Sequence, residues 1–398
     1  MMNEKMYAIG SKRSTIREIF EYAKTRSAQI GKENVFDFSI GNPSVPAPAC
    51  VHATIKKLLL ETPSVELHGY TSAQGGKDVR DAIAANFTRR FGVPICGDDL
   101  YMTCGAAASL TITCKALANA DDEFIVFAPF FPEYRVFVEN AGAKLVVVDC
   151  DQDTLLPDFE ALERAITPKT KGVIINSPNN PSGVVYGEKT MEKLAEILGV
   201  KSEEYGEPIY LISDEPYREL IYDPNTIVPC PMAYYADTII CYSYSKSLSL
   251  PGERVGYIAV SPKAGEARKL YAAVCGAGRS LGFVCAPALF QRVAAACDGQ
   301  TADLNVYRKN RDLLYNALTD YGFTCVYPDG AFYLFMKSPE TDAAAFCERA
   351  KKYELLFVNG EDFGAKGFVR IAYCVGTEQI ERALPLFEKL AKEYNLKK

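Results

Sequence analysis

Short apolar runs alternate with longer amphipathic stretches through the middle of the chain. Each apolar run has the length of a buried strand, and the stretches between the runs carry apolar residues at helical spacing. This alternation predicts an α/β fold with a mostly parallel, doubly wound sheet that has helices on both faces. The predicted strands are 100–103, 123–128, 144–149, 172–176, 209–213, 238–242 and 255–260, and the predicted helices are 106–118, 133–141, 157–166, 188–199 and 264–275.

The link between the last two predicted strands, 238–242 and 255–260, departs from this alternation. It has only about a dozen residues and contains Pro251-Gly252, whereas a parallel connection needs a longer crossover, usually a helix. We therefore expect strand 255–260 to run antiparallel to the rest of a seven-stranded sheet.

The two ends of the chain show a different pattern. Strands and helices near the C-terminus follow one another without strict alternation, which indicates an α+β domain. The sequence predicts a large domain at 50–285 and a smaller one formed by 1–49 and 286–398, joined by a long helix. The elements expected outside the central sheet are a helix-prone segment at 1–34, a short strand and loop at 35–49, helices at 50–61 and 77–91, a helical region at 286–321, strands near 323–327, 331–336 and 368–373, and helices at 341–352 and 377–395.

Composition narrows the class of protein. The chain has 398 residues, 48% of them hydrophobic and 24% charged, which is typical of a soluble globular protein large enough for two domains. Its net charge of −6, with no long run of one sign, argues against nucleic acid or an anionic membrane as a partner. No apolar run has the length of a membrane span and the N-terminus lacks the apolar core of a signal peptide, so we expect a cytoplasmic protein.

Cysteine and histidine usage excludes several kinds of site. The 13 cysteines include no Cys-x-x-Cys pair, which favours reduced thiols over a disulfide framework or a zinc site. The two histidines are too few for most histidine-rich metal sites, and neither lies near a nucleophile-elbow motif. We therefore expect neither a metal site nor a Ser-His-Asp hydrolase.

Lys246 is the first candidate for chemistry, because it follows the predicted buried strand 238–242. Partial desolvation and neighbouring positive charge lower the pKa of a lysine and free its amine as a nucleophile. The hydroxyls of Ser243 and Ser245 and the guanidinium of Arg254 suit a phosphate group. A lone lysine after a strand is usually a solvated surface residue, so the interpretation depends on what lies at the other strand ends.

Ligands of open α/β sheets bind at the carboxyl ends of the strands. A helix start there attracts a phosphate, an aromatic residue stacks on a flat ring, and a buried carboxylate pairs with a protonated ring nitrogen. Together with a lysine, these groups fit pyridoxal 5′-phosphate. Each signal alone has a structural alternative: a tight turn, core packing of the aromatic, or a rigid loop. The residues are Gly105, Ala106 and Ala107 at a helix start, and Phe131, Asn180, Asp214 and Tyr217 after three further strands.

Four motifs in this order resemble the class I/II aminotransferases of the aspartate aminotransferase fold family. They are Asn-Pro-Ser-Gly at 180–183, Asp-Glu-Pro-Tyr at 214–217, Ser-x-Ser-Lys at 243–246 and Arg-Val-Gly at 254–256. The resemblance runs from Gly41 to Arg370 and implies the fold of type I pyridoxal-phosphate-dependent transferases. It also implies amino-group transfer between an amino acid and a 2-oxo acid.

The resemblance assigns roles around the cofactor. Lys246 would hold it through a Schiff base and later move a proton between the substrate Cα and C4′, and Asp214 would keep the pyridine nitrogen protonated. Tyr217 and Asn180 would bind the phenolic oxygen, and Phe131 would stack on the ring where many relatives have tryptophan or tyrosine. The phosphate would be bound by Ser243, Arg254 and the loop Gly105-Ala106-Ala107, which lacks the hydroxyl residue of many relatives.

The resemblance also assigns substrate groups and an assembly. Arg370 would bind the substrate α-carboxylate, assisted by the N–H of Gly41 and by Asn180. Tyr70 is similar to a tyrosine that reaches a phosphate in the neighbouring subunit, which implies a homodimer with shared active sites. Arg279 has nearly the spacing of an arginine that binds a distal carboxylate, and the alternative is a surface or interface arginine.

Two other functions share many of these residues. A pyridoxal-phosphate-dependent carbon–sulfur β-lyase has the same fold and nearly the same site. A transcriptional regulator with an aminotransferase-like domain would need an added DNA-binding domain, but only about 34 residues, not strongly basic, precede the first motif.

Overall fold

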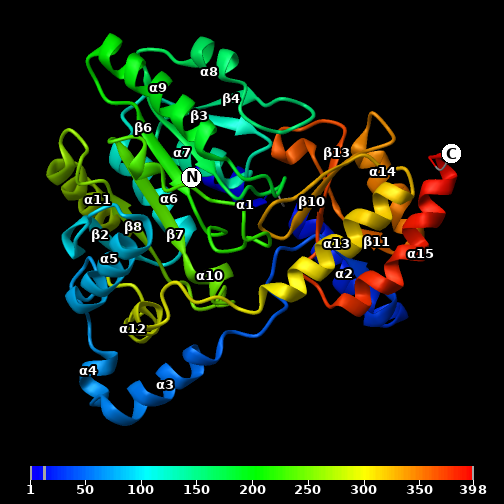
Figure 1. Cartoon of the computed structure of the whole chain (residues 1–398), viewed down its shortest axis with the longest axis horizontal. Coiled ribbons are helices and arrows are strands. Elements are labelled where there is room, and N and C mark those ends of the chain that lie inside the picture. Colours follow the sequence, from blue (N-terminus) through cyan, green and yellow to red (C-terminus); the bar gives the residue numbers. More distant parts are fainter. Residues whose placement is uncertain (1, 12–14, 397–398) are drawn as a thin grey trace. The chain divides into compact units, whose positions relative to one another are not determined.

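The computed structural model describes residues 2–11 and 15–396, and the chain divides into two compact units (Figure 1). The first unit comprises Met1–Ser44, Asn305–Pro328 and Phe332–Lys398, and the second comprises Val45–Leu304 and Asp329–Ala331. Compact units need not be independently folding domains, so the predicted domain division at 49 and 285 stays a prediction.

The second unit is built on the predicted seven-stranded sheet, with the strand order β2-β8-β7-β6-β5-β3-β4. β8 runs antiparallel to both of its neighbours and the remaining pairs are parallel, which confirms the expectation from the short link before it. The strands are β2 (Leu100–Thr103), β3 (Glu123–Ala128), β4 (Lys144–Asp149), β5 (Thr170–Asn176), β6 (Tyr210–Asp214), β7 (Thr238–Ser243) and β8 (Gly256–Val260).

Helices cover this sheet, and its central strands are therefore buried along nearly their whole length. Strands that are covered on both faces read as continuous apolar runs, which is why the sequence signal was strong here. The helices are α3 (Ala49–Glu61), α4 (Ser64–His68), α5 (Lys77–Phe91), α6 (Ala106–Leu117), α7 (Glu133–Asn140), α8 (Phe159–Ala165), α9 (Glu188–Tyr205), α10 (Tyr244–Ser247), α11 (Ala267–Leu281) and α12 (Ala288–Ala296).

The single helical region expected at 286–321 is wrong, because α12 ends at Ala296 and α13 (Leu304–Asp320) begins only after a break. Gly299 has a φ of 82°, a left-handed conformation that ends helices and favours glycine. Asp298 fixes the break by accepting hydrogen bonds from the Asn86 amide at 2.6 Å and the Tyr244 hydroxyl at 2.9 Å.

The first unit contains an antiparallel sheet of four strands in the order β12-β13-β10-β9, and a parallel pair, β1 with β11. The two-residue strands β11 and β12 were not expected, because so short a segment shows no alternation of apolar and polar residues. The elements are α1 (Glu4–Ser11), α2 (Thr15–Ile30), β1 (Phe36–Asp37), β9 (Cys325–Val326), β10 (Tyr333–Lys337), α14 (Ala343–Ala350), β11 (Leu355–Leu356), β12 (Val358–Asn359), β13 (Phe368–Ala372) and α15 (Thr377–Glu393), together with α13 from its second residue onward.

No helix within residues 2–11 and 15–396 is both long enough and apolar enough to cross a membrane. Within the same residues, no group of three or more histidine, cysteine, aspartate and glutamate side chains is arranged to hold a metal ion.

Candidate active site

The carboxyl ends of the parallel strands β5, β6 and β7 lie side by side in the second unit. Asn176 pairs with Asp214 across β5 and β6, and Asp214 pairs with Cys241 across β6 and β7. The polar residues that follow these strands therefore gather at one edge of the sheet. Asp214, Tyr217, Asn180 and Ser243 are buried there, and Lys246 is half-buried.

Asp214 has one carboxylate oxygen with a partner and one without. Its Oδ2 accepts a hydrogen bond of 2.6 Å from the Tyr134 hydroxyl. Its Oδ1 is buried and accepts no hydrogen bond from any residue that the structure describes. Burial raises the pKa of Asp214 from 3.8 to about 7, the Tyr134 hydrogen bond opposes this rise, and the Glu215 carboxylate adds to it.

A buried carboxylate oxygen needs a hydrogen-bond donor, and a cationic donor compensates its charge best. The open Oδ1 of Asp214 therefore fits the protonated ring nitrogen of pyridoxal phosphate. Tyr134, at the start of α7, was missed by the sequence reasoning, which considered the aromatics after β3 only for stacking and packing. Its place one helical turn after Phe131 was an available signal, and the two rings meet edge to face with centroids 5.6 Å apart.

Asn176 connects the Asp214 strand to the loop that carries Asn180. Its amide donates to the Asp214 carbonyl at 2.8 Å, and its Oδ1 accepts from the Asn180 backbone N–H at 2.7 Å. The next asparagine, Asn179, accepts hydrogen bonds from the N–H and the hydroxyl of Ser182 at 3.0 and 2.8 Å. The loop is thus cross-linked, and its geometry does not depend on a ligand.

Gly105, at the start of α6, packs directly against the guanidinium of Arg254. A Cβ at Gly105 would lie 2.9 Å from an Arg254 nitrogen, and Gly105 has a φ of 86°, so only glycine suits this position. The helix start supplies N–H groups and partial positive charge, and the exposed Arg254 adds a full charge. This combination fits a phosphate group.

The hydroxyl of Ser243 accepts from the Ser245 N–H at 3.2 Å and donates to the Ser245 hydroxyl at 2.8 Å, which fixes the start of the short helix α10. Lys246 lies in this helix. The hydroxyl of the next residue, Ser247, forms a hydrogen bond of 3.1 Å with the Tyr242 hydroxyl. This bond holds the turn that carries the lysine against β7. Ala106 and Ala107 are the first two residues of α6, and their methyl side chains leave only backbone N–H groups to offer a ligand.

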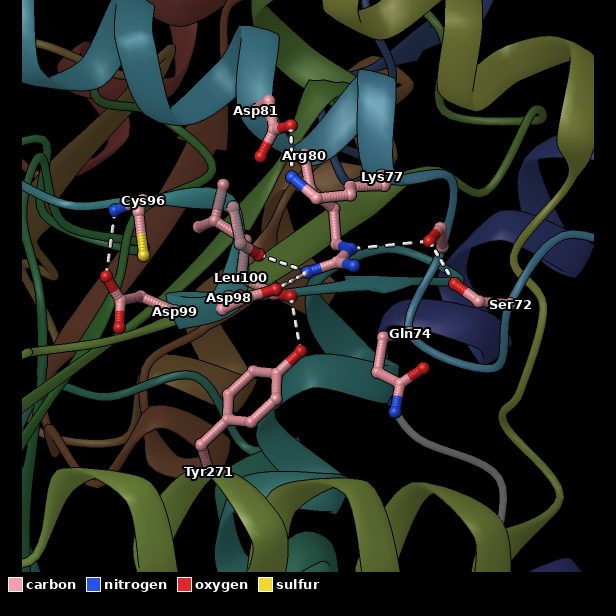
Figure 2. Close-up of polar contacts among 12 residues, drawn as sticks. Ser72, Gln74, Lys77, Arg80, Asp81, Cys96, Asp98, Asp99, Leu100 and Tyr271 are labelled. Atoms are coloured by element: carbon pink, nitrogen blue, oxygen red, sulfur yellow. Dashed lines mark hydrogen bonds and ion pairs between the residues drawn. The ribbon is translucent and has the colours of Figure 1, made fainter.

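Tyr70 is 99% exposed, although hydrogen bonds hold the loop that follows it. Arg80 of α5 donates to the Gly75 carbonyl at 3.3 Å and to the Asp98 carboxylate at 3.3 Å, and Figure 2 shows it reaching toward the segment of Ser72 and Gln74. On the other side, the Gly76 N–H donates to the buried Gln291 side chain at 3.0 Å.

Three further predicted site residues belong to other elements of the chain. Arg279 is exposed in the last turn of α11. Gly41 and Arg370 belong to the first unit, where both contact Tyr333. Arg370 is 2% exposed, and its Nη2 donates to the Ser39 carbonyl.

Comparisons with known proteins identify the family and the fold of this chain. Residues 33–385 match the family described as aminotransferase class I and II. A probable aspartate aminotransferase of Methanocaldococcus jannaschii is 31% identical over 387 residues, covering 95% of this chain and 97% of that protein. A crystal structure of an aminotransferase from Eubacterium rectale is 56% identical, with a TM-score of 0.97 over 99% of both chains. An aspartate aminotransferase from Thermus thermophilus with maleate is 27% identical, with a TM-score of 0.85 over 98% of this chain and 99% of that one.

Asp214→Asn is expected to stabilise the ligand-free protein at high pH. The raised pKa means that the folded chain keeps a proton that the unfolded chain loses between pH 3.8 and about 7. Stability therefore falls as the pH rises through this window, by about 4 kcal/mol in total. Asparagine has no charge to bury, so the melting temperature of the variant should exceed that of the wild type most at about pH 8 and least near pH 4.

The exposed Asp223, substituted by asparagine, is the matched control and should show no such trend with pH. A difference between wild type and Asp214→Asn that stays constant from acid to alkaline pH would contradict the assignment.

Proposed function

Because this chain belongs to the class I and II aminotransferase family, it is a pyridoxal-phosphate-dependent transaminase, and we propose that it moves an amino group between aspartate or another L-amino acid and a 2-oxo acid such as 2-oxoglutarate. The observation that carries the proposal is the open, buried Oδ1 of Asp214 at the sheet edge where the strand before Lys246 also ends. When bound, pyridoxal phosphate supplies an electron sink for the carbanion that forms at the substrate Cα.

The residues of the second unit hold the cofactor in this proposal. Lys246 binds it covalently through Nζ, and Asp214 accepts the ring N–H and keeps it protonated. Tyr217 and Asn180 bind the phenolic oxygen, and Phe131 covers one face of the ring. The phosphate is bound by Ser243, Arg254 and the N–H groups of Gly105 and its neighbours Ala106 and Ala107.

Lys246 would have a second task as the base of the reaction. Its amine would move a proton between the substrate Cα and C4′ of the cofactor. The hydrogen bond between Ser247 and Tyr242 supports this role, because it holds the backbone turn from which the Lys246 side chain extends.

Arg370 and Gly41 bind the substrate in this proposal. A guanidinium pairs with a carboxylate through two parallel hydrogen bonds, which fixes the orientation of the α-carboxylate. The backbone N–H of Gly41 and the amide of Asn180 add further donors for the same group.

The proposed chemistry is tested by covalent labelling and a donor screen. Borohydride reduction of the cofactor-loaded protein, followed by peptide mapping, should find the pyridoxyl group on Lys246. Aspartate, alanine, aromatic and branched amino acids, each with 2-oxoglutarate, should yield glutamate for at least one donor, and Lys246→Ala should lose several orders of magnitude in turnover. Label on another lysine would refute the assignment. Release of pyruvate and ammonia from cystathionine without any 2-oxo acid would identify a β-lyase instead.

We also propose that the working unit is a cytoplasmic homodimer in which Tyr70 reaches the phosphate of the partner subunit. The nearly complete exposure of Tyr70 on a fastened loop supports the shared site. The thirteen cysteines, all of them free thiols, support a reducing compartment.

Mixing Tyr70→Phe and Lys246→Ala protomers tests the shared site. If Tyr70 is donated across the interface, both lesions fall in one site of the mixed dimer and the other site is intact. The mixture should then recover roughly half of the wild-type activity per mixed dimer, whereas each parent alone is impaired. No recovery on mixing, or an active monomer by light scattering, would end this proposal.

Arg279 is proposed to bind the distal carboxylate of a dicarboxylic substrate. Arg279→Ala should then lose activity with aspartate and glutamate by roughly 2–5 kcal/mol in transition-state binding, and much less with alanine in a half-reaction assay. Lys269→Ala, which removes a positive charge from the same helix, is the matched control. Equal losses for both classes of donor would mean that Arg279 has only a structural role.

A further inference from the structure

Two aromatic rings pack against the guanidinium of Arg370 in the first unit. The guanidinium carbon lies 4.7 Å from the centroid of the Tyr333 ring and 4.9 Å from that of Phe363. A guanidinium is planar, and ring faces against it restrict the orientation of its plane. Since the N–H groups lie in that plane, the rings also determine the direction in which Arg370 donates its hydrogen bonds.

These rings come from elements that are themselves fixed. Tyr333 begins β10, which pairs antiparallel with β13 so that Phe335 lies opposite Arg370. Tyr333 is therefore the diagonal neighbour of Arg370 on the same face of the sheet. Tyr333 is 2% exposed and Phe363 is fully buried, so neither ring has room to turn away from the guanidinium.

Tyr333 also packs against Gly41. A Cβ at Gly41 would overlap the Tyr333 hydroxyl and would lie 3.0 Å from the Phe332 ring, so the phenol rests directly on the glycine Cα. One side chain thus contacts both groups that are proposed to bind the substrate carboxylate. The spacing between the Arg370 guanidinium and the Gly41 backbone depends on the volume of Tyr333.

The segment before Gly41 is held to the same strand by its backbone. The Ala372 N–H donates to the Phe38 carbonyl at 2.8 Å, and Arg370 donates to the carbonyl of Ser39. Ser39 is oriented in turn by Asp37, whose Oδ1 accepts from the Ser39 N–H at 2.8 Å and from its hydroxyl at 2.6 Å. These contacts fix the segment along the strand, and Tyr333 sets its distance from the guanidinium.

We propose that Tyr333 is the positioning residue of the carboxylate site and that it determines affinity for the α-carboxylate of both the amino acid and the 2-oxo acid, with Phe363 as a second support. The inference rests on the proposed function, and it extends that function to two residues that do not themselves react. Bidentate binding of a carboxylate requires alignment of two planar groups, and a guanidinium released from its ring loses that alignment.

Tyr333→Leu is compared with Tyr327→Leu as a matched control, because Tyr327 packs against Arg311 in the same unit at a similar distance, 4.8 Å. The probe is maleate, an unreactive dicarboxylate, and its dissociation constant is measured by titration calorimetry on the pyridoxal-phosphate-loaded protein. Tyr333→Leu should raise this constant and the KM for 2-oxoglutarate about tenfold or more, with kcat changed less than about threefold. Tyr333→Phe keeps the ring against Arg370 but removes the hydroxyl that rests on Gly41, so its loss of affinity should lie between the wild type and Tyr333→Leu.

The melting temperature is measured for every variant. If Tyr333→Leu does not fold, Phe363→Leu takes its place with the same expectation. Wild-type affinity for maleate in the leucine variant, or an equal loss in Tyr327→Leu, would overturn the inference. If the proposed function is wrong, the wild type itself will transfer no amino group from any donor. If only this inference is wrong, the wild type will be active and Tyr333→Leu will bind maleate as well as the wild type does.

Discussion

A carboxylate buried at the end of β6, with one oxygen left open, is the constraint around which the second unit is arranged. An isolated ionised carboxylate in such a place is strongly unfavourable, which is why the pKa of Asp214 rises to about 7. The Tyr134 hydroxyl compensates one oxygen, and none of the residues that the structure describes donates a hydrogen bond to the other. The same feature that lowers the stability of the empty protein therefore favours a cationic ring at this position.

Hydrogen bonds from the neighbouring strand β5 link the Asp214 segment to the rest of the site. Asn176 bonds the backbone of both Asp214 and Asn180, so the backbone segments that carry the carboxylate and the amide are tied to each other. The first unit shows a comparable arrangement around a single residue, since Tyr333 contacts both Arg370 and Gly41. In both cases the groups proposed to meet a ligand are positioned by side chains that need not touch it.

Much of the fold was predictable because the central strands are buried on both faces and leave continuous apolar runs. The antiparallel β8 followed from a link too short for a crossover helix, and the motif residues followed from their places after the strands. The break between α12 and α13 was not predictable, because it depends on Asp298 meeting Asn86 and Tyr244, which are distant in sequence. The contacts of Tyr134 and Tyr333 could not be predicted for the same reason. From the sequence, a buried tyrosine cannot be told from an ordinary core residue, because the partner of its hydroxyl is unknown.

The loop after Tyr70 has a consequence for the proposed homodimer. Its backbone is already bonded to Arg80, Gln291 and Met102 within a single chain. A second copy that receives the Tyr70 ring would therefore meet an ordered loop, and assembly would lose little backbone entropy at this point of contact. Preorganisation of this kind slows dissociation more than it speeds encounter, and it favours a long-lived dimer over a transient one.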